Sequence, residues 1–338
     1  MEPGFEAAKG AAETILGVKL PILMRVILPG LEATAVLYPA VAWLLHFLPH
    51  QGAEIWQPVA GYVVLVLLLG AMISTANSEI YKIYEGRMGW PERLAEWARQ
   101  RQAARVARLQ QAAKTAASKM RYDEMWEQLR AYPIDGDGNP EATHPTMLGN
   151  ILAAYEQYPN TRYNMDSVFY FRRIWLQLDK DRKEEIDGQW CIADGFLILS
   201  AIAIAGTAIW AVQAMVALFG ISRTGLPFAG PGWTLLGSVG WLGVGVGWYR
   251  FSLPYHRENG EVFKSIFDLY RSKIWSVTHR KPAERETWEA VWSYLQYLAV
   301  KCPNCGKWTS MTGDQCSKCN FGLAEFTKKL KETGKLTI

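Results

Sequence analysis

The chain has 338 residues, of which 50% are hydrophobic and 20% are charged, and its mean hydropathy is −0.04. This average combines long uncharged runs with strongly charged segments, which excludes a disordered chain and argues against a wholly soluble globule. A net charge of +4 is too small to identify a nucleic-acid binder. Four of the five cysteines lie within 18 residues, which excludes a disulfide-rich secreted domain.

Four apolar segments have about the length needed to cross a bilayer, whose hydrocarbon core takes roughly 20 residues of helix. They are residues 31–48, 58–76, 195–219 and 232–251. The alternative is that they are core helices of a large soluble protein. The third segment disfavours that alternative, because its 25 residues include no charged side chain. We therefore predict an all-α polytopic membrane protein with four transmembrane helices.

Lys and Arg are distributed unevenly around these segments. Residues 49–57 contain neither, and residues 220–231 contain only Arg223. The stretches that follow the second and fourth spans and precede the third are basic. Because Lys and Arg concentrate on the cytoplasmic side, we expect both termini and the long middle loop to be cytoplasmic. This orientation describes a multi-pass membrane protein.

The start of the first span contains charged residues. Arg25 and Glu32 are seven residues apart, so an unbroken helix would place them on one face. One hypothesis makes them, together with Asp194, a polar path inside the membrane bundle. The other makes residues 13–28 an amphipathic helix at the membrane surface, with residues 29–30 as a hinge before the true span. We favour the second hypothesis.

The fourth span is rich in glycine, and Gly243 and Gly247 lie four residues apart. Small residues at this spacing let membrane helices approach one another closely. We predict that this face packs against another helix, either of the same chain or of another subunit. A pore lined by glycine is the alternative.

Residues 77–192 are predicted to form a helical cytoplasmic domain. Within it, residues 91–130 should form one long helix, because no glycine and no proline follows the first position. Its section 93–121 carries eight Lys or Arg and one Glu. Attraction to anionic lipid headgroups is the simplest role for such a surface, and a nucleic-acid contact or a solvated face are the alternatives. The basic residues are Arg93, Arg99, Arg101, Arg105, Arg108, Lys114, Lys119 and Arg121.

The stretch HPTMLGNILAAYEQYPNTRYNMD, at residues 144–166, is followed by RRIWLQLD at residues 172–179. The two stretches resemble a region of uncharacterised bacterial four-span membrane proteins. That family pairs Pro-Thr-x-Leu-Gly-Asn with Arg-Tyr-x-x-Asp ahead of its third span. The resemblance implies the architecture and a bacterial origin, and it brings no activity with it.

The C-terminal part contains the most specific chemical motif. After a predicted helical pair at residues 253–300, the cysteines form two Cys-x-x-Cys pairs separated by ten residues. Two such pairs deliver four thiolates to one zinc ion, so residues 301–325 are predicted to be a zinc ribbon. The stretch resembles a zinc ribbon of the rubredoxin-knuckle type. Iron is the alternative metal, since the same ligands bind it. The predicted ligands are Cys302, Cys305, Cys316 and Cys319.

Four cysteine ligands leave no open coordination position, so the predicted zinc is structural. The chain has no HExxH, no GxxxxGK[ST] and no GxSxG motif. We therefore expect no enzymatic activity. Residues 326–338 form a basic tail, and residues 1–30 form the N-terminal amphipathic segment.

Three functional hypotheses follow. The leading one is an oligomeric membrane protein whose cytoplasmic domain binds a protein partner or a signal and couples it to the membrane helices, as a scaffold or a gated pore. The second is a small transporter with a polar path at Glu32 and Arg25. The third is a membrane tether for nucleic acid or a protein complex, through the basic helix and the ribbon.

Overall fold

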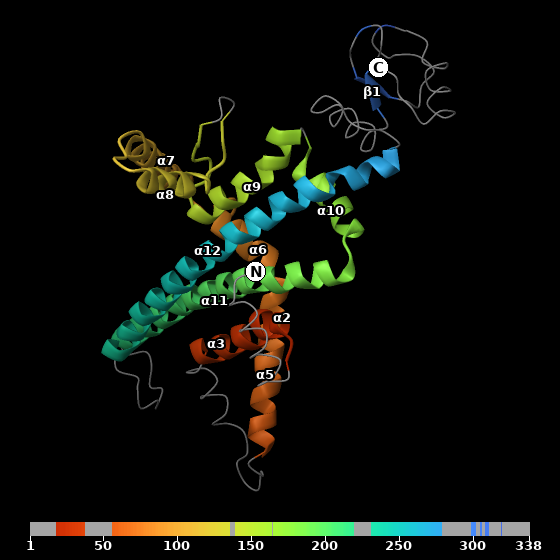
Figure 1. Ribbon diagram of the computed structural model, residues 1–338. Coiled ribbons are helices and arrows are strands. Elements are labelled where there is room, and N and C mark those ends of the chain that lie inside the picture. The colour runs from red at the N-terminus through yellow and green to blue at the C-terminus, as the bar shows by residue number, and fades with distance from the viewer. Residues whose placement is uncertain are drawn as a thin grey trace. The chain divides into compact units, whose positions relative to one another are not determined.

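The computed structural model describes residues 18–37, 56–135, 139–163, 165–219, 231–278, 299–301, 305, 308–310 and 319 (Figure 1). The described chain is mainly helical, as predicted. Its short strands β1 (Ala299–Lys301) and β2 (Trp308–Ser310) pair antiparallel, with Lys301 opposite Trp308.

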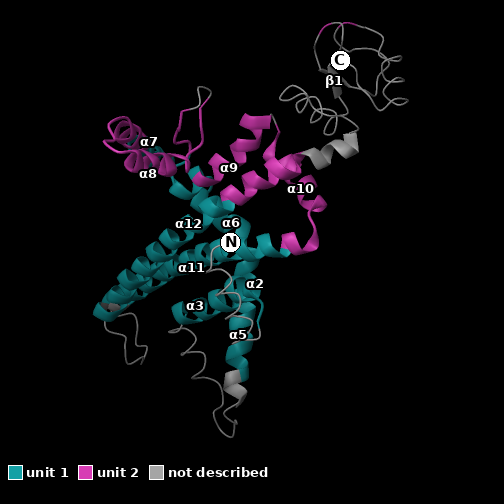
Figure 2. Cartoon of the chain, viewed as in Figure 1, with its two compact units in different colours: residues 1–105, 144–150, 184–259 teal, residues 106–143, 151–183, 260–338 magenta. Residues whose placement is uncertain are grey.

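The chain divides into two compact units (Figure 2). Unit 1 comprises residues 1–105, 144–150 and 184–259, and unit 2 comprises residues 106–143, 151–183 and 260–338. The predicted cytoplasmic domain, residues 77–192, is therefore divided between both units. Among the described helices, α7, α9, α11 and α12 cross from one unit to the other without a break.

Unit 1 begins with one continuous helical stretch made of α2 (Leu20–Ile22), the π-helical turn η1 (Leu23–Ile27) and α3 (Leu28–Val36). The predicted hinge at residues 29–30 is wrong, because the backbone stays helical there. The wider π turn directly precedes Pro29, whose ring and missing N–H would disturb an ordinary α-helical turn. The helix thus accommodates the proline next to a wider turn.

Two further helices of unit 1 follow each other closely. Helix α5 runs over Trp56–Thr75 and contains no charged residue. Helix α6 runs over Asn77–Glu85 and ends at Gly86, whose φ of 82° is left-handed. A residue with a side chain would be strained there, so glycine suits this helix end.

The longest helices are α11 (Lys180–Leu218, 39 residues) and α12 (Pro231–Thr278, 48 residues). Helix α11 joins the charged residues 180–187 and the predicted third span into one element. Helix α12 joins the predicted fourth span and the first helix of the predicted pair at 253–300 into one element. At about 1.5 Å per residue, α12 is roughly 70 Å long, more than twice the thickness of a bilayer core.

By length and hydropathy, one helix in the described part of the chain can cross a membrane, over Lys180–Val216. A second candidate exists if Ala60–Thr75 and Asn77–Glu85, which meet at 53°, are counted as one bent span. This test supports neither the predicted number of four transmembrane helices nor the predicted cytoplasmic location of the termini.

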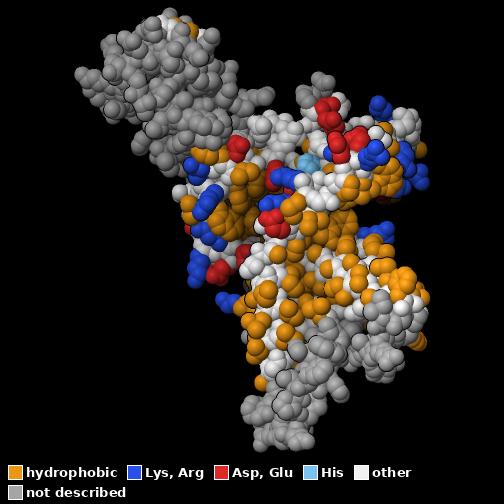
Figure 3. Space-filling view, turned by 180° about the vertical axis from the view of Figure 1, so that it is seen from behind, with side chains coloured by type: hydrophobic (Ala, Val, Ile, Leu, Met, Phe, Trp, Pro, Cys, Tyr) orange, Lys and Arg blue, Asp and Glu red, His pale blue; other side chains and the backbone are white. Residues whose placement is uncertain are grey.

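Exposed apolar side chains cover the uncharged parts of three helices in unit 1. Figure 3 shows them as a broad hydrophobic surface with few charges. Soluble monomers seldom expose apolar patches of more than a few hundred Å². The large exposed side chains include Tyr62, Val64, Leu68 and Met72 of α5, Val212, Met215 and Leu218 of α11, and Trp233, Leu236, Val239 and Leu242 of α12.

Two glycines allow close contact between helices of unit 1. A Cβ atom on Gly30 would overlap the carbonyl group of Val66, and one on Gly70 would overlap the carbonyl group of Val26. The stretch 20–36 and α5 therefore pack backbone against backbone at two points.

In the described part of the chain, the glycines of the predicted fourth span do not all pack against a helix, although the spacing of Gly243 and Gly247 predicts this. A Cβ on Gly243 or Gly247 would meet open space within the described chain, whereas one on Gly237 would touch Trp210 and one on Gly245 would touch Ile204. The packing of Gly243 and Gly247 against a helix of the same chain is therefore wrong for the described residues. Their contact with another subunit stays a prediction.

Unit 2 contains most of the predicted basic helix, but this segment is not one helix. It breaks into α7 (Glu92–Lys114) and α8 (Lys119–Leu129). Ser118 starts α8 by accepting a hydrogen bond from the Arg121 N–H, and the Thr115 hydroxyl bonds back to Gln111. These local side-chain bonds compete with a continuous helix, which composition alone did not reveal.

The rest of unit 2 is built on α9 (Met147–Tyr163), α10 (Ser167–Gln177) and the last part of α12. Phe263 and Phe267 of α12 are buried, and the Phe171 ring stacks on both, at 4.8 and 6.4 Å between centroids. The part of α12 that follows the predicted fourth span therefore packs on α10.

We predict that Gly70→Ala lowers the melting temperature of the purified protein in detergent. The added methyl group would force the helices apart, and overpacking of this kind costs about 1–3 kcal/mol. Gly61→Ala is the matched control on the same helix, because open space surrounds Gly61. Equal melting temperatures for the two variants would contradict the close contact of the two backbones.

Candidate functional site

A cluster of charged side chains joins three elements of unit 1. The Arg25 guanidinium donates to Asp194 Oδ2 through Nε at 3.0 Å and Nη2 at 2.7 Å, and to Asp187 Oδ1 through Nη1 at 2.9 Å. Both aspartates come from α11, where seven residues, or nearly two turns, place them on one face. Arg25 comes from η1, so this ion pair links the N-terminal helix to α11.

The second oxygen of the Asp194 carboxylate is also occupied. The Tyr81 hydroxyl of α6 donates to Asp194 Oδ1 at 2.6 Å. The Tyr81 ring in turn lies edge-on to the His256 ring of α12, with centroids 5.6 Å apart. Asp194 is therefore the centre of a network that links η1, α6, α11 and α12. We call Arg25, Asp187, Asp194, Tyr81 and His256 the Asp194 cluster.

Burial sets the electrostatics of this cluster. The side chains of Arg25 and Asp194 are 25% and 14% exposed, whereas that of Asp187 is 46% exposed. Burial opposes the charge of Arg25, but the charges and hydrogen bonds of Asp194 and Asp187 raise its pKa above the ordinary value. Burial lowers the pKa of His256 to about 3, so its ring is neutral at physiological pH. The cluster thus holds its cation and its anions paired.

Glu32 lies apart from this cluster. Its Oε1 accepts a hydrogen bond from Trp248 Nε1 at 3.2 Å, and its Oε2 is buried and has no hydrogen-bond partner among the described residues. Arg25 and Glu32 therefore do not contact each other, as the less favoured hypothesis of a shared polar path would require. Arg25 instead bonds to Asp194, the third residue of that hypothesis, which lies 169 positions away in the chain.

A second polar network in unit 1 surrounds the start of α9. The Thr146 hydroxyl donates to the Tyr84 carbonyl oxygen, and the Tyr249 hydroxyl accepts from the Leu148 N–H at 3.3 Å. The Asn150 side chain donates to the carbonyl oxygens of His144 and Thr146 at 2.8 and 2.7 Å. The Pro-Thr-x-Leu-Gly-Asn motif thus fastens the start of α9 to α6 and α12.

Tyr84 extends this network into α11. The Ser200 hydroxyl donates to the Gly245 carbonyl oxygen at 2.8 Å, so the Tyr84 hydroxyl is the donor of the 2.7 Å bond to Ser200. The rings of Tyr84 and Tyr249 also stack, with centroids 5.5 Å apart. We call these bonds, with those of Thr146 and Leu148, the Tyr84 network.

A comparable polar group in the described part of unit 2 is centred on Asp268 of α12. Its carboxylate accepts from the hydroxyls of Tyr158 at 2.9 Å and Tyr163 at 2.5 Å. Partial burial and the neighbouring carboxylate raise the pKa of Tyr158, so this hydroxyl stays protonated and keeps donating. The Arg-Tyr-x-x-Asp motif supplies Tyr163 to this contact, and its Asp166 caps α10 by accepting from the Phe169 N–H.

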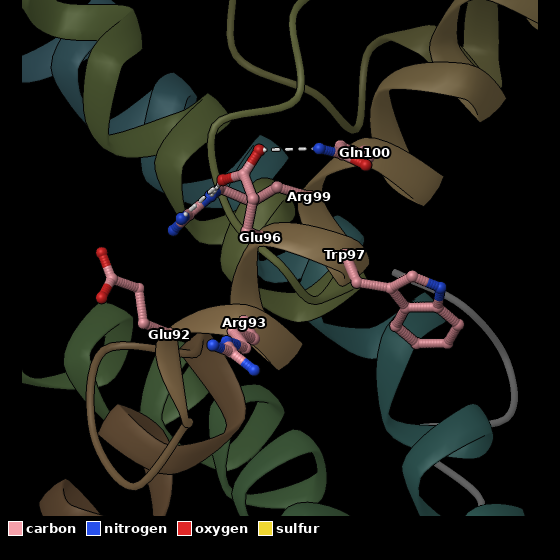
Figure 4. Close-up of a pocket in the computed structure, with 6 residues that line it drawn as sticks. All are labelled: Glu92, Arg93, Glu96, Trp97, Arg99 and Gln100. Atoms are coloured by element: carbon pink, nitrogen blue, oxygen red, sulfur yellow. Dashed lines mark hydrogen bonds and ion pairs between the residues drawn. The ribbon is translucent and has the colours of Figure 1, made fainter.

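The predicted basic surface lies on two helices. Its residues are exposed except Arg99, which is half-buried and bonds to Glu96. Figure 4 shows an open hollow along α7, where Glu96 holds Arg99 and Gln100 on one side and the Trp97 ring points away from them. Arg101 lies over the Trp97 ring at 4.7 Å from its centroid.

The predicted zinc ligands are placed only in part. Cys302 and Cys316 lie outside the described residues, and no three or more His, Cys, Asp or Glu side chains in the described part converge as a metal site. The pairing of Lys301 with Trp308 brackets the first cysteine pair between two antiparallel strands, which suits a zinc knuckle. The zinc ribbon remains a prediction.

Comparisons with known proteins give no match among family models, curated proteins or solved structures. The interpretation of the site therefore depends on its own geometry.

Neither polar cluster of unit 1 has the arrangement of a catalytic centre. In the Asp194 cluster both carboxylate oxygens of Asp194 are already bonded, and the neutral His256 ring contacts a tyrosine ring instead of a nucleophile. Such a group can hold helices in one arrangement and release them when a bond breaks. Sequence reasoning named Arg25 and Asp194 but missed Asp187, Tyr81 and His256. The seven-residue spacing of Asp187 and Asp194 was a readable signal, whereas Tyr81 and His256 gave none.

We predict that Arg25→Gln and Asp194→Asn each lower the melting temperature and that their effects are not additive. Arg25→Gln leaves Asp194 without its cation, and Asp194→Asn leaves Arg25 with only the more exposed Asp187. The double change removes both of the less exposed charges, so the coupling energy should be about 1–3 kcal/mol. Thermal unfolding in detergent measures all members of the cycle. Asp187→Asn is the control, and its smaller effect follows from its exposure of 46%. Additive losses would show that Arg25 and Asp194 do not stabilise each other.

Proposed function

We propose that this protein is a non-enzymatic, oligomeric protein of a bacterial inner membrane, with four membrane helices and both termini in the cytoplasm. Its cytoplasmic helices bind a protein partner or a signal and couple that event to the membrane helices, as a scaffold or a gated pore. The observation that carries the proposal is the continuity of α11 and α12, each of which contributes residues to both units.

The exposed surface of unit 1 supports the membrane location. The apolar side chains on α5, α11 and α12 belong to stretches without charge, and they face outward instead of forming a core. In water this exposure would be unfavourable, whereas lipid tails accept it. Exposed valine, leucine and methionine on three helices therefore favour several spans over one.

The position of the polar clusters supports the coupling. Asp194 directly precedes the uncharged stretch 195–218 of α11. Tyr249 is the last residue of the uncharged stretch 231–249 of α12. The Asp194 cluster and the Tyr84 network thus fasten the helices where their apolar parts end. A rearrangement of one helix at this level must break or move bonds to the others.

The transporter hypothesis is less well supported by the geometry. A polar path needs charged groups that face a cavity, but Arg25 and Asp194 neutralise each other and both bond to further partners. Glu32 retains a buried oxygen without a hydrogen-bond partner in the described chain, and this is the observation that keeps the hypothesis open.

The proposal predicts a defined oligomer that contains about one zinc ion per chain. Native mass spectrometry in mild detergent gives the subunit number, and metal analysis of the same sample gives the zinc content. A strictly monomeric protein would contradict both the oligomeric scaffold and the pore.

The cysteine variants provide the matched control. Cys302→Ser should lose the zinc, because it removes one of four thiolate ligands. Cys191→Ser should keep the zinc, because Cys191 is buried in unit 1 beside Ile192 and Met24. Zinc contents that fall equally in both variants would contradict the predicted ribbon.

A further inference from the structure

The outer face of α7 combines exposed basic and apolar side chains. Leu94, Trp97, Arg101, Arg105 and Arg108 recur at intervals of three or four residues, so they line one face of the helix. Leu94 and Trp97 are 46% and 52% exposed. We call these five residues the α7 outer face.

The other side of α7 is the one that packs. Ala95, Val106 and Ala113 are between 4% and 7% exposed. The two acidic residues of the helix, Glu92 and Glu96, lie off the outer face, and Glu96 is held by Arg99 and Gln100. The outer face therefore presents three exposed arginines beside one leucine and one tryptophan. Figure 3 shows Lys and Arg gathered beside hydrophobic side chains over α7 and α8.

We propose that the α7 outer face docks on the anionic lipid headgroups of the membrane that holds the chain. Arginines attract phosphate groups, and Trp97 and Leu94 suit the boundary between headgroups and acyl chains. The contact of Arg101 with the Trp97 ring holds a cation and an aromatic surface side by side. This inference rests on the proposed membrane location of α5 and α11.

The chain length keeps α7 close to the bilayer. Only residues 76–91 separate α5 from α7, and nine of them form α6. At the lengths per residue of helix and extended chain, this connection spans at most about 40 Å. A lipid surface is therefore always within reach of α7, whereas a nucleic acid must be recruited from solution.

Photo-crosslinking in the full-length protein tests this docking. Benzoylphenylalanine is placed at Ala104, on the side of the outer face, or at Ala103, about 100° around the helix and also exposed. Each protein is put into nanodiscs of phosphatidylcholine alone or of phosphatidylcholine with phosphatidylglycerol, and lipid adducts are measured by mass spectrometry. We expect several-fold more adduct at position 104 than at 103, and more with the anionic lipid.

Changing Arg101 and Arg105 to Gln together should lower the adduct at position 104 several-fold. Equal adduct yields at positions 104 and 103, or adduct yields that do not depend on the anionic lipid, would overturn the docking. Neither result would contradict the membrane location. A preference of position 104 for an added single-stranded oligonucleotide over lipid would also overturn it, in favour of nucleic acid. A chain that does not enter nanodiscs at all would contradict the proposed membrane location itself, and the docking with it.

Discussion

The Asp194 carboxylate is the interaction on which the arrangement of unit 1 depends. It lies at the first turn of the uncharged part of α11, where the surroundings change from polar to apolar. A half-buried anion at such a position is unfavourable unless it is paired and hydrogen-bonded. Arg25 of η1 and Tyr81 of α6 bond to this carboxylate. The need to pair one charge therefore fixes three helical segments, η1, α6 and α11, relative to one another.

Close packing adds to this constraint. Gly30 and Gly70 let the N-terminal helix and α5 touch through their backbones, and Met24 packs against α11 near Gly195. In lipid, the location proposed for these helices, hydrophobic burial between them contributes little, and van der Waals contact and polar bonds would hold the helices together. The same residues therefore stabilise the fold and determine which motions it allows.

The sequence was informative where a signal is local. The uncharged run 195–219 correctly indicated a helix, which is part of α11. The break between α7 and α8 was missed, because Thr115 and Ser118 act through individual side-chain bonds that composition does not show. The hinge at residues 29–30 was wrong because a π turn accommodates the proline.

The partners of charged residues were the hardest part to predict. Periodicity places two residues of one helix on the same face, as for Asp187 and Asp194, but it cannot show which residue of a distant helix approaches them. The proximity of Arg25 and Glu32 in the sequence suggested a pair that the fold does not form. The partner of Arg25 became visible only when α11 was placed beside the N-terminal helix.

Hydrogen–deuterium exchange tests most directly whether the polar clusters couple the two units. The measurement compares the unaltered protein with Arg25→Gln in nanodiscs, and Arg87→Gln, which breaks the more exposed pair with Glu85, is the control. The account predicts faster exchange of backbone amides in residues 151–163 and 167–177 of unit 2 for Arg25→Gln only, because the loss of the ion pair loosens helices that both units share. A change confined to the helices around Asp194 would contradict the coupling.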